Sequence, residues 1–256
     1  MPVDASTPVF KDHFSAVAAD YAQARPEYPD ALYAWIASIA PAHASAWEAG
    51  CGSGQATRGL ARHFARVFAT DPSAAQIAQA SGPENATFAV ETGERCSLPD
   101  ASVDAVCVAQ ALHWFEREAF FAACGRVLKP GGVLVAWGYQ DIEVPTQVAG
   151  ANAALQDEIR ASWPPERDLI DQGYAGFRWP FEAVQAPCFD LSAEWTLPRL
   201  LGYFSSYSAT RRFREATGRD PVAAHAGALV AAWGAPDTPR TVRWPMFVHA
   251  RRKPPG

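Results

Sequence analysis

The segment WEAGCGSGQ, residues 47–55, is the most informative part of this sequence. It places glycine at positions 50, 52 and 54, directly after the acidic residue Glu48. Glycine loses more backbone entropy on folding than any other residue, so such a cluster usually marks a sharp turn or a close approach to a ligand. The segment follows a short strand-like stretch and precedes a helical pattern. It therefore predicts a ligand-binding loop between a strand and the amino end of a helix.

Outward from this loop, strand-like and helix-like segments alternate along the chain. Strands are expected at 45–50, 66–71, 86–91, 103–110 and 133–139, and helices at 57–65, 73–81 and 117–128. This alternation is typical of an α/β fold with a doubly wound parallel sheet and helices on both faces. Ligands bind such sheets at the carboxyl ends of the strands.

After residue 139 the pattern changes. Helices are expected at 146–163, 196–218 and 222–234, and strands at 181–192 and 241–252. No repeat or low-complexity linker separates these elements from the earlier ones. We therefore expect one domain over residues 1–256, with a core at about 31–140, an amino-terminal helical cover over 1–30, and a lid with the last strands over 141–256.

Composition and charge indicate which kinds of binding partner and which cellular compartment to expect. The formal net charge is −5, so no global basic field points to nucleic acid. The five cysteines are odd in number and form no CxxC pair, which favours reduced thiols and argues against a structural zinc site or a disulfide framework. The first residues contain no apolar segment typical of a signal peptide, and no apolar run is long enough to span a bilayer, so we expect neither feature. We expect a cytoplasmic protein without bound metal that acts on a small molecule, as a monomer or a homodimer.

Two ligand classes compete for the glycine loop. A dinucleotide site would need GxGxxG or GxGxxA, but the third position of that pattern is Gln55. The pattern present is Glu48 followed by GxGxG, which resembles motif I of the class I S-adenosylmethionine-dependent methyltransferases. Further elements of that family follow in order, from FATDPS (68–73) through ALHWF (111–115) to LKPGGVLVAWGY (128–139). Within the family the chain is most similar to the type 11 group and its trans-aconitate methyltransferase-like subgroup.

The resemblance implies a seven-stranded, mostly parallel sheet with a helical lid, and a set of cofactor-binding residues. In the family the glycine loop contacts the methionine part of the cofactor, an acid after the second strand the ribose, and the loop after the third strand the adenine. Carried over to this chain, the set is Tyr21, Arg25, Glu48, Gly50, Cys51, Gly52, Gly54, Asp71, Pro72, Thr92, Gly93, Glu94, Ala109 and Gln110. Thr92 stands where many relatives carry Asp, so the adenine contact is expected from main chain or a hydroxyl.

His113, after the expected fourth strand, is the candidate catalytic residue. A histidine close to the transferred methyl group can act as a general base or contact the substrate. It can equally be a hydrogen-bonded structural residue packed against Trp114, because methyl transfer needs little beyond alignment of the two reactants. Arg178 is a second candidate, for a carboxylate on the acceptor. Arg211, Arg212 and Arg214 are expected on a solvated helix face.

The resemblance implies transfer of a methyl group from S-adenosylmethionine to a small-molecule acceptor by in-line displacement. Two alternatives stay open: a non-catalytic cofactor-binding module and a nicotinamide-dependent oxidoreductase. We expect segments 12–30, 140–180 and 196–235, rich in aromatic residues, to cover the carboxyl ends of the strands and enclose the acceptor. The sequence does not identify the acceptor.

Overall fold

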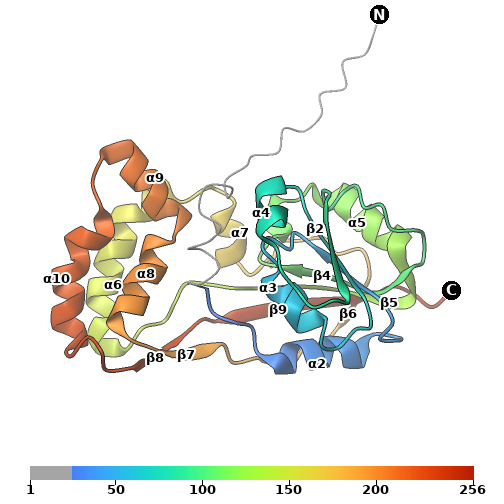
Figure 1. Ribbon diagram of the computed structural model, residues 1–256, viewed down its shortest axis with the longest axis horizontal. Helices are drawn as coiled ribbons and strands as arrows, with labels where there is room; N and C mark the ends of the chain where they lie inside the picture. The colour runs from blue at the N-terminus through green and yellow to red at the C-terminus, as the bar shows by residue number, and fades with distance from the viewer. Residues whose placement is uncertain (1–24) are drawn as a thin grey trace, which may run out of the picture.

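A computed structural model describes residues 25–256 of the chain (Figure 1). Its centre is a seven-stranded sheet in the order β3-β2-β1-β4-β5-β9-β6. The strands are β1 (Ala46–Ala49), β2 (Val67–Asp71), β3 (Ala86–Val90), β4 (Val103–Ala109), β5 (Leu128–Tyr139), β6 (Glu182–Val184) and β9 (Met246–Arg252). The first five are parallel, and β9 runs antiparallel to both of its neighbours. The predicted doubly wound, mostly parallel, seven-stranded sheet is confirmed.

The strand order positions the site. The chain moves outward from β1 to β3 and then crosses back to β4, so the order reverses between β1 and β4. In open α/β sheets such a reversal leaves a crevice at the carboxyl ends of the two strands. The WEAGCGSGQ segment leaves β1 at this point.

Helices cover both faces of the sheet, as Figure 1 shows. They are α2 (Asp30–Ile39), α3 (Gln55–Leu60), α4 (Ala74–Gln79) and α5 (Arg117–Val127). The side chains of α2 and α3 join one apolar core and those of α5 join another on the opposite face. Strand β1 is buried along its whole length, as expected for a parallel strand covered on both faces.

The segments after β5 build a helical layer beside the sheet, on the left of Figure 1. It contains α6 (Thr146–Ile159), η2 (Arg160–Ser162), α8 (Leu197–Ser205), α9 (Ser208–Thr217) and α10 (Pro221–Trp233), with a two-stranded sheet of β7 (Ser192–Trp195) and β8 (Arg240–Arg243). The short helix α7 (Arg167–Asp171) lies between this layer and the sheet, and its Ile170 joins the apolar core on the α5 face. This layer meets the sheet at the carboxyl end of β5, where Tyr139 packs against Trp244 at a ring distance of 6.4 Å.

Three predicted elements are wrong in extent. The helix expected over 196–218 is two helices, α8 and α9, which the residues Ser206 and Tyr207 separate. The strand expected over 181–192 is two short strands in different sheets, β6 and β7. The strand expected over 241–252 breaks at Pro245, which has no N–H to donate to a ladder, and its halves β8 and β9 also belong to different sheets.

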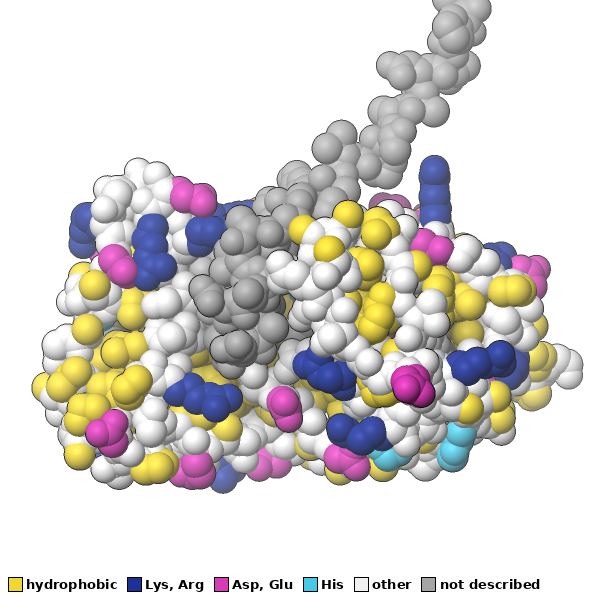
Figure 2. Space-filling model, viewed as in Figure 1, with side chains coloured by type: hydrophobic (Ala, Val, Ile, Leu, Met, Phe, Trp, Pro, Cys, Tyr) yellow, Lys and Arg dark blue, Asp and Glu magenta, His cyan; other side chains and the backbone are white. Residues whose placement is uncertain are grey.

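Two surface features bear on partners. No helix within residues 25–256 is long and apolar enough to cross a bilayer. On the face shown in Figure 2, lysine and arginine side chains are scattered and interspersed with acidic ones, so this face carries no extended basic patch.

Candidate functional site

A cavity opens at the carboxyl ends of β1, β2, β4 and β5. Its volume is about 150 Å³, and part of it is open to solvent. Eight residues predicted to bind the cofactor line it: Arg25, Glu48, Gly50, Cys51, Gly52, Asp71, Ala109 and Gln110. Seven further residues complete the wall: Tyr28, Ser53, Gln55, Gln76, Ala111, Trp114 and Tyr139.

The three loop glycines all adopt left-handed backbone angles, but they differ in their surroundings. A Cβ at Gly50 would lie 2.5 Å from the Cβ of Ala111, and one at Gly54 would lie 3.0 Å from the ring of Phe88. At Gly52 the nearest neighbour of a Cβ among residues 25–256 would be the side-chain oxygen of Gln76, 3.8 Å away. Internal packing therefore requires glycine at 50 and 54, whereas at 52 the backbone faces the cavity.

Glu48 is a buried carboxylate at the cavity wall, with 1% of its surface exposed. It accepts a hydrogen bond from the Thr57 hydroxyl at 2.5 Å, and no arginine or lysine within residues 25–256 forms an ion pair with it. Burial raises the pKa of Glu48 to about 8, against the effect of the Thr57 hydrogen bond. In the ligand-free protein Glu48 is therefore mostly protonated at neutral pH, and a ligand with an ammonium group would favour its ionised form, so the site fits the methionine end of the predicted cofactor.

The raised pKa of Glu48 predicts a pH-dependent stability of the ligand-free protein. A carboxyl group whose pKa is higher in the folded than in the unfolded protein stabilises the fold below its unfolded pKa, and this contribution is lost as the pH rises through the folded value. Glu48→Gln removes the ionisation and keeps an oxygen for Thr57. We expect the variant to become more stable than the wild type between about pH 4.5 and 8, by up to about 1.4 kcal/mol per pH unit.

Urea unfolding of both proteins at several pH values measures this difference. A difference that stays constant between pH 5 and pH 8 would show that Glu48 ionises normally in the folded protein.

Asp71, the last residue of β2, ties the glycine loop to the next helix. One carboxylate oxygen accepts from the backbone N–H of Gly52 at 2.9 Å, and the other from that of Ser73 at 2.9 Å. Ser73 in turn caps α4, accepting from the N–H of Gln76 at 3.3 Å. Each carboxylate oxygen can accept more than one hydrogen bond, so this arrangement is compatible with the predicted contact to ribose hydroxyls.

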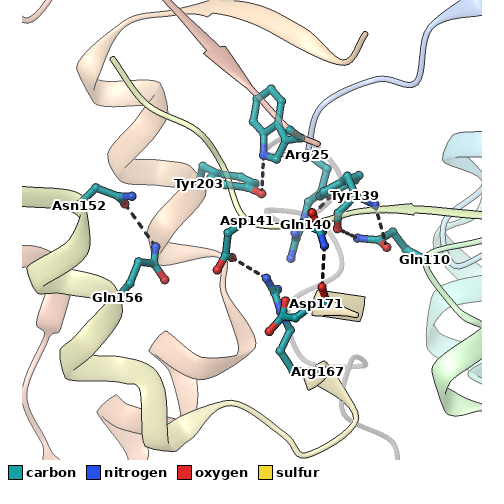
Figure 3. Close-up of polar contacts among 11 residues, drawn as sticks. Arg25, Gln110, Tyr139, Gln140, Asp141, Asn152, Gln156, Arg167, Asp171 and Tyr203 are labelled. Carbon is teal, nitrogen blue, oxygen red and sulfur yellow. Dashed lines mark hydrogen bonds and ion pairs between the residues drawn. The ribbon is translucent and has the colours of Figure 1, made fainter. Parts of the chain in front are cut away.

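Gln110 follows β4 in a left-handed conformation, with φ of 52°, which is uncommon outside glycine. Its side-chain amide donates to the carbonyl of Tyr139 at 3.1 Å and accepts from the N–H of Tyr139 at 3.3 Å, as Figure 3 shows. A Cβ at Gly138 would lie 2.3 Å from the same amide oxygen, so glycine there makes room for it. Strained residues of this kind persist where surrounding contacts fix them, often at functional sites.

The loop after β3 lies outside the cavity wall. Glu94 accepts a hydrogen bond from the N–H of Glu116 at 2.8 Å, and a Cβ at Gly93 would lie 3.0 Å from the ring of Phe115. These contacts brace the start of α5. Thr92, Gly93, Glu94 and Pro72 do not line the cavity, Tyr21 lies outside the described residues, and Gly54 is buried behind the loop. A role of these residues in cofactor binding stays a prediction.

His113 lies in the short helix η1 (Leu112–Trp114) and does not line the cavity. Its Nδ1 is 3.0 Å from the hydroxyl of Tyr174, and its ring lies 4.7 Å from that of Trp114. Burial lowers the pKa of His113 to about 3, which makes the imidazole neutral and a weak base at neutral pH. The catalytic role of His113 stays a prediction, and its contacts are those of a packed, hydrogen-bonded residue.

The other predicted arginines lie away from the cavity wall. Arg178 is exposed, and Arg214 pairs with Asp220 at 2.7 Å. Arg211 lies 3.8 Å from Glu215, one turn along the same helix. A role of Arg178 toward an acceptor carboxylate stays a prediction.

Aromatic residues of the wall were the part of the site that we did not predict individually. Trp114 lies in ALHWF and Tyr139 ends LKPGGVLVAWGY, two segments on which the family resemblance rests, so these segments contained a signal for the wall. Tyr28 lies in RPEYP, residues 25–29, three residues after Arg25. Arg25 donates to the hydroxyl of Tyr139 at 3.4 Å and lies 5.4 Å from the ring centre of Tyr203 in α8. One side of the cavity is thus aromatic, with Arg25 between the sheet and the helical layer (Figure 3).

Comparison with known proteins agrees with this geometry. A family model described as "Methyltransferase domain" matches residues 47–136. A candidate methyltransferase of Dictyostelium discoideum is 32% identical over 216 residues, covering 82% of each chain. An uncharacterized methyltransferase of Mycobacterium tuberculosis is 33% identical over 186 residues, covering 72% of this chain and 70% of its own. A solved structure of a candidate type II methyltransferase from Anaeromyxobacter dehalogenans is 42% identical, with a TM-score of 0.85 over 91% of this chain and 99% of its own. The chain therefore belongs to the class I S-adenosylmethionine-dependent methyltransferases.

Proposed function

We propose that this methyltransferase binds S-adenosylmethionine in the cavity at the carboxyl ends of β1, β2, β4 and β5, and moves its methyl group to a small-molecule acceptor. The observation that carries the proposal is the buried carboxylate of Glu48 beside the left-handed loop at Gly52, both at the cavity wall. A cationic ligand with an extended polar chain fits this site, because Glu48 can face its positive charge and the backbone at Gly52 leaves room for its chain.

When bound, the cofactor supplies a methyl group on a sulfonium that is already activated for displacement. The chain's own contribution is then binding, alignment and exclusion of water. Glu48 offers a carboxylate to an ammonium group, Asp71 holds the loop and offers acceptors to a diol, and the backbone at Gly52 allows close approach. Ala109 and Gln110 line the cavity at the carboxyl end of β4.

We place the acceptor on the aromatic side of the cavity, next to Tyr28, Trp114 and Tyr139. Small-molecule pockets are mostly apolar with a few placed polar groups, and the hydroxyl of Tyr139 and the guanidinium of Arg25 are such groups. The helical layer would act as a lid over this side, because it meets the sheet at Tyr139. We further propose that the protein works in the cytoplasm, in keeping with its five free cysteines.

Transfer of a labelled methyl group separates an enzyme from a non-catalytic binding module. The protein is incubated with methyl-labelled S-adenosylmethionine and a small-molecule metabolite extract, and the products are resolved by mass spectrometry. Protein-dependent label in a small molecule is expected. Label that never leaves the cofactor, in protein that binds it, would support the binding-module alternative.

A further inference from the structure

The turn after α7 holds an aromatic side chain in a strained backbone conformation. Gly173 and Tyr174 have φ angles of 55° and 59°, two left-handed residues in succession. For a non-glycine residue this conformation is uncommon and unfavourable. The Tyr174 side chain is nevertheless only 1% exposed, so its contacts hold it in place against the strain.

Those contacts join three parts of the fold. The Tyr174 ring stacks on Phe177 at 4.7 Å and meets the edge of Phe247 of β9 at 4.9 Å. The carbonyl of Gly173 is 2.6 Å from Nε2 of His249, also in β9. The Tyr174 hydroxyl reaches His113 of η1 at 3.0 Å.

The helix before the turn is itself fixed to the end of β5, as Figure 3 shows. Arg167 of α7 pairs with Asp141 at 2.5 Å, and Gln140 donates to the carbonyl of Asp171 at 2.6 Å. The turn with Tyr174 is therefore a rigid anchor and not a free loop.

The segment 111–115, which contains η1, contributes to the cavity wall on both sides of His113. Trp114 and Ala111 line the cavity. Phe115 and Ala111 pack against Gly50, where a Cβ would lie 3.1 Å and 2.5 Å from them. A small displacement of η1 would therefore move Trp114 in the cavity wall and press on the glycine loop at Gly50, because close-packed contacts leave no empty space to absorb the movement.

We propose that Tyr174 and His113 form a latch that positions η1, and so sets the cavity wall at Trp114 and the packing of the glycine loop. Both are positioning residues. The proposal rests on the proposed function, since the cavity is taken to be the cofactor site. It assigns His113 a role through Nδ1 and Tyr174, in place of proton transfer to or from an acceptor.

Four variants test the latch: Tyr174→Phe, His113→Leu, the double variant, and His113→Asn. Asparagine places an amide close to the position of Nδ1 and so can keep the hydrogen bond to Tyr174, whereas it cannot act as a base. His225→Gln is the matched control, because His225 also makes a side-chain hydrogen bond, to Glu158 at 2.8 Å, but within the helical layer. S-adenosylmethionine affinity is measured by isothermal titration and stability by urea unfolding.

We expect Tyr174→Phe and His113→Leu each to weaken S-adenosylmethionine binding about three- to tenfold, and the double variant to bind no more weakly than the weaker single one, because both remove the same contact. His113→Asn should bind within about twofold of the wild type, as should His225→Gln. Independent, multiplying effects of the two single substitutions would overturn the latch. So would a loss of stability in both with unchanged affinity, which is the result of a merely structural contact.

The methyl-transfer assay with the metabolite extract separates the latch from a base. Under the proposal His113→Asn retains transfer. Abolished transfer in His113→Asn, with normal transfer in Tyr174→Phe, would overturn it in favour of a base. A wild-type protein that binds no S-adenosylmethionine would instead refute the proposed function, which is a distinct outcome.

Discussion

Replacing Asp104 by alanine is expected to lower the free energy of unfolding by about 3–5 kcal/mol. Asp104 lies in β4 and is fully buried. One of its oxygens accepts from the backbone N–H groups of Ala44 and Ser45 at 3.0 and 2.9 Å, and the other pairs with Lys129 at 2.8 Å. Alanine would leave these donors without their acceptor at the start of β1, and buried polar groups without partners cost several kcal/mol together.

The exposed carboxylate of Asp100 provides the control. It pairs with Arg126 at 3.0 Å, and its side chain is 81% exposed. Asp100→Ala should therefore change the unfolding free energy by less than about 1 kcal/mol. Urea unfolding measures both variants. A loss below about 1 kcal/mol in Asp104→Ala would show that the buried network contributes little to the fold.

Gly52→Val is expected to weaken S-adenosylmethionine binding by more than about 100-fold, or about 2.7 kcal/mol, while the protein stays folded. Among residues 25–256, a Cβ at this position meets only the Gln76 oxygen at 3.8 Å, so the described part of the chain leaves space for the Cβ and the added side chain would occupy the cavity. Valine at a φ of 54° also costs about 1–2 kcal/mol of stability. That backbone strain has to be separated from the lost ligand contact.

Gly131→Val makes this separation. Gly131 has a φ of 75° and does not line the cavity, and no atom in the described part of the chain lies within 4 Å of a Cβ placed there. The two variants should therefore lose similar stability by urea unfolding, and only Gly52→Val should lose binding in isothermal titration. Normal binding by Gly52→Val would place the ligand elsewhere.

The sheet was predictable because its strands carry local signals. Each of β1, β2, β3 and β4 is a short apolar run bounded by turn residues, and the runs alternate with helical patterns. The family resemblance implied seven strands in a mostly parallel sheet, but we predicted neither the order of the strands nor the antiparallel direction of β9, since no local pattern specifies which strands pair. Pro245 was the clearest sequence signal that we did not use, because it separates β8 from β9 within the single strand expected over 241–252.

The part of the site on the glycine loop was also predictable, because turn geometry there depends on neighbouring residues. Gly50 and Gly52 are of this kind, whereas Asp71, 19 residues from Gly52 along the chain, was predicted from the family resemblance. The aromatic wall depends instead on contacts between distant segments, such as Arg25 with Tyr139 and His113 with Tyr174. Nothing in the sequence around His113 distinguishes a base from a latch, because the difference lies in a partner 61 residues away.

The conformation of Gln110 was unpredictable for the same reason. Its left-handed backbone depends on an amide contact with Tyr139 and on the space left by Gly138. A side chain used in this way has less capacity to bind a ligand, so a cofactor contact at Gln110 would come mainly from its backbone.

Isothermal titration of the wild-type protein with S-adenosylmethionine, its demethylated product and NAD tests the central claim most directly. The account predicts saturable binding of S-adenosylmethionine and of its demethylated product at one shared site per chain, and no binding of NAD. Saturable binding of NAD with no response to S-adenosylmethionine would contradict it.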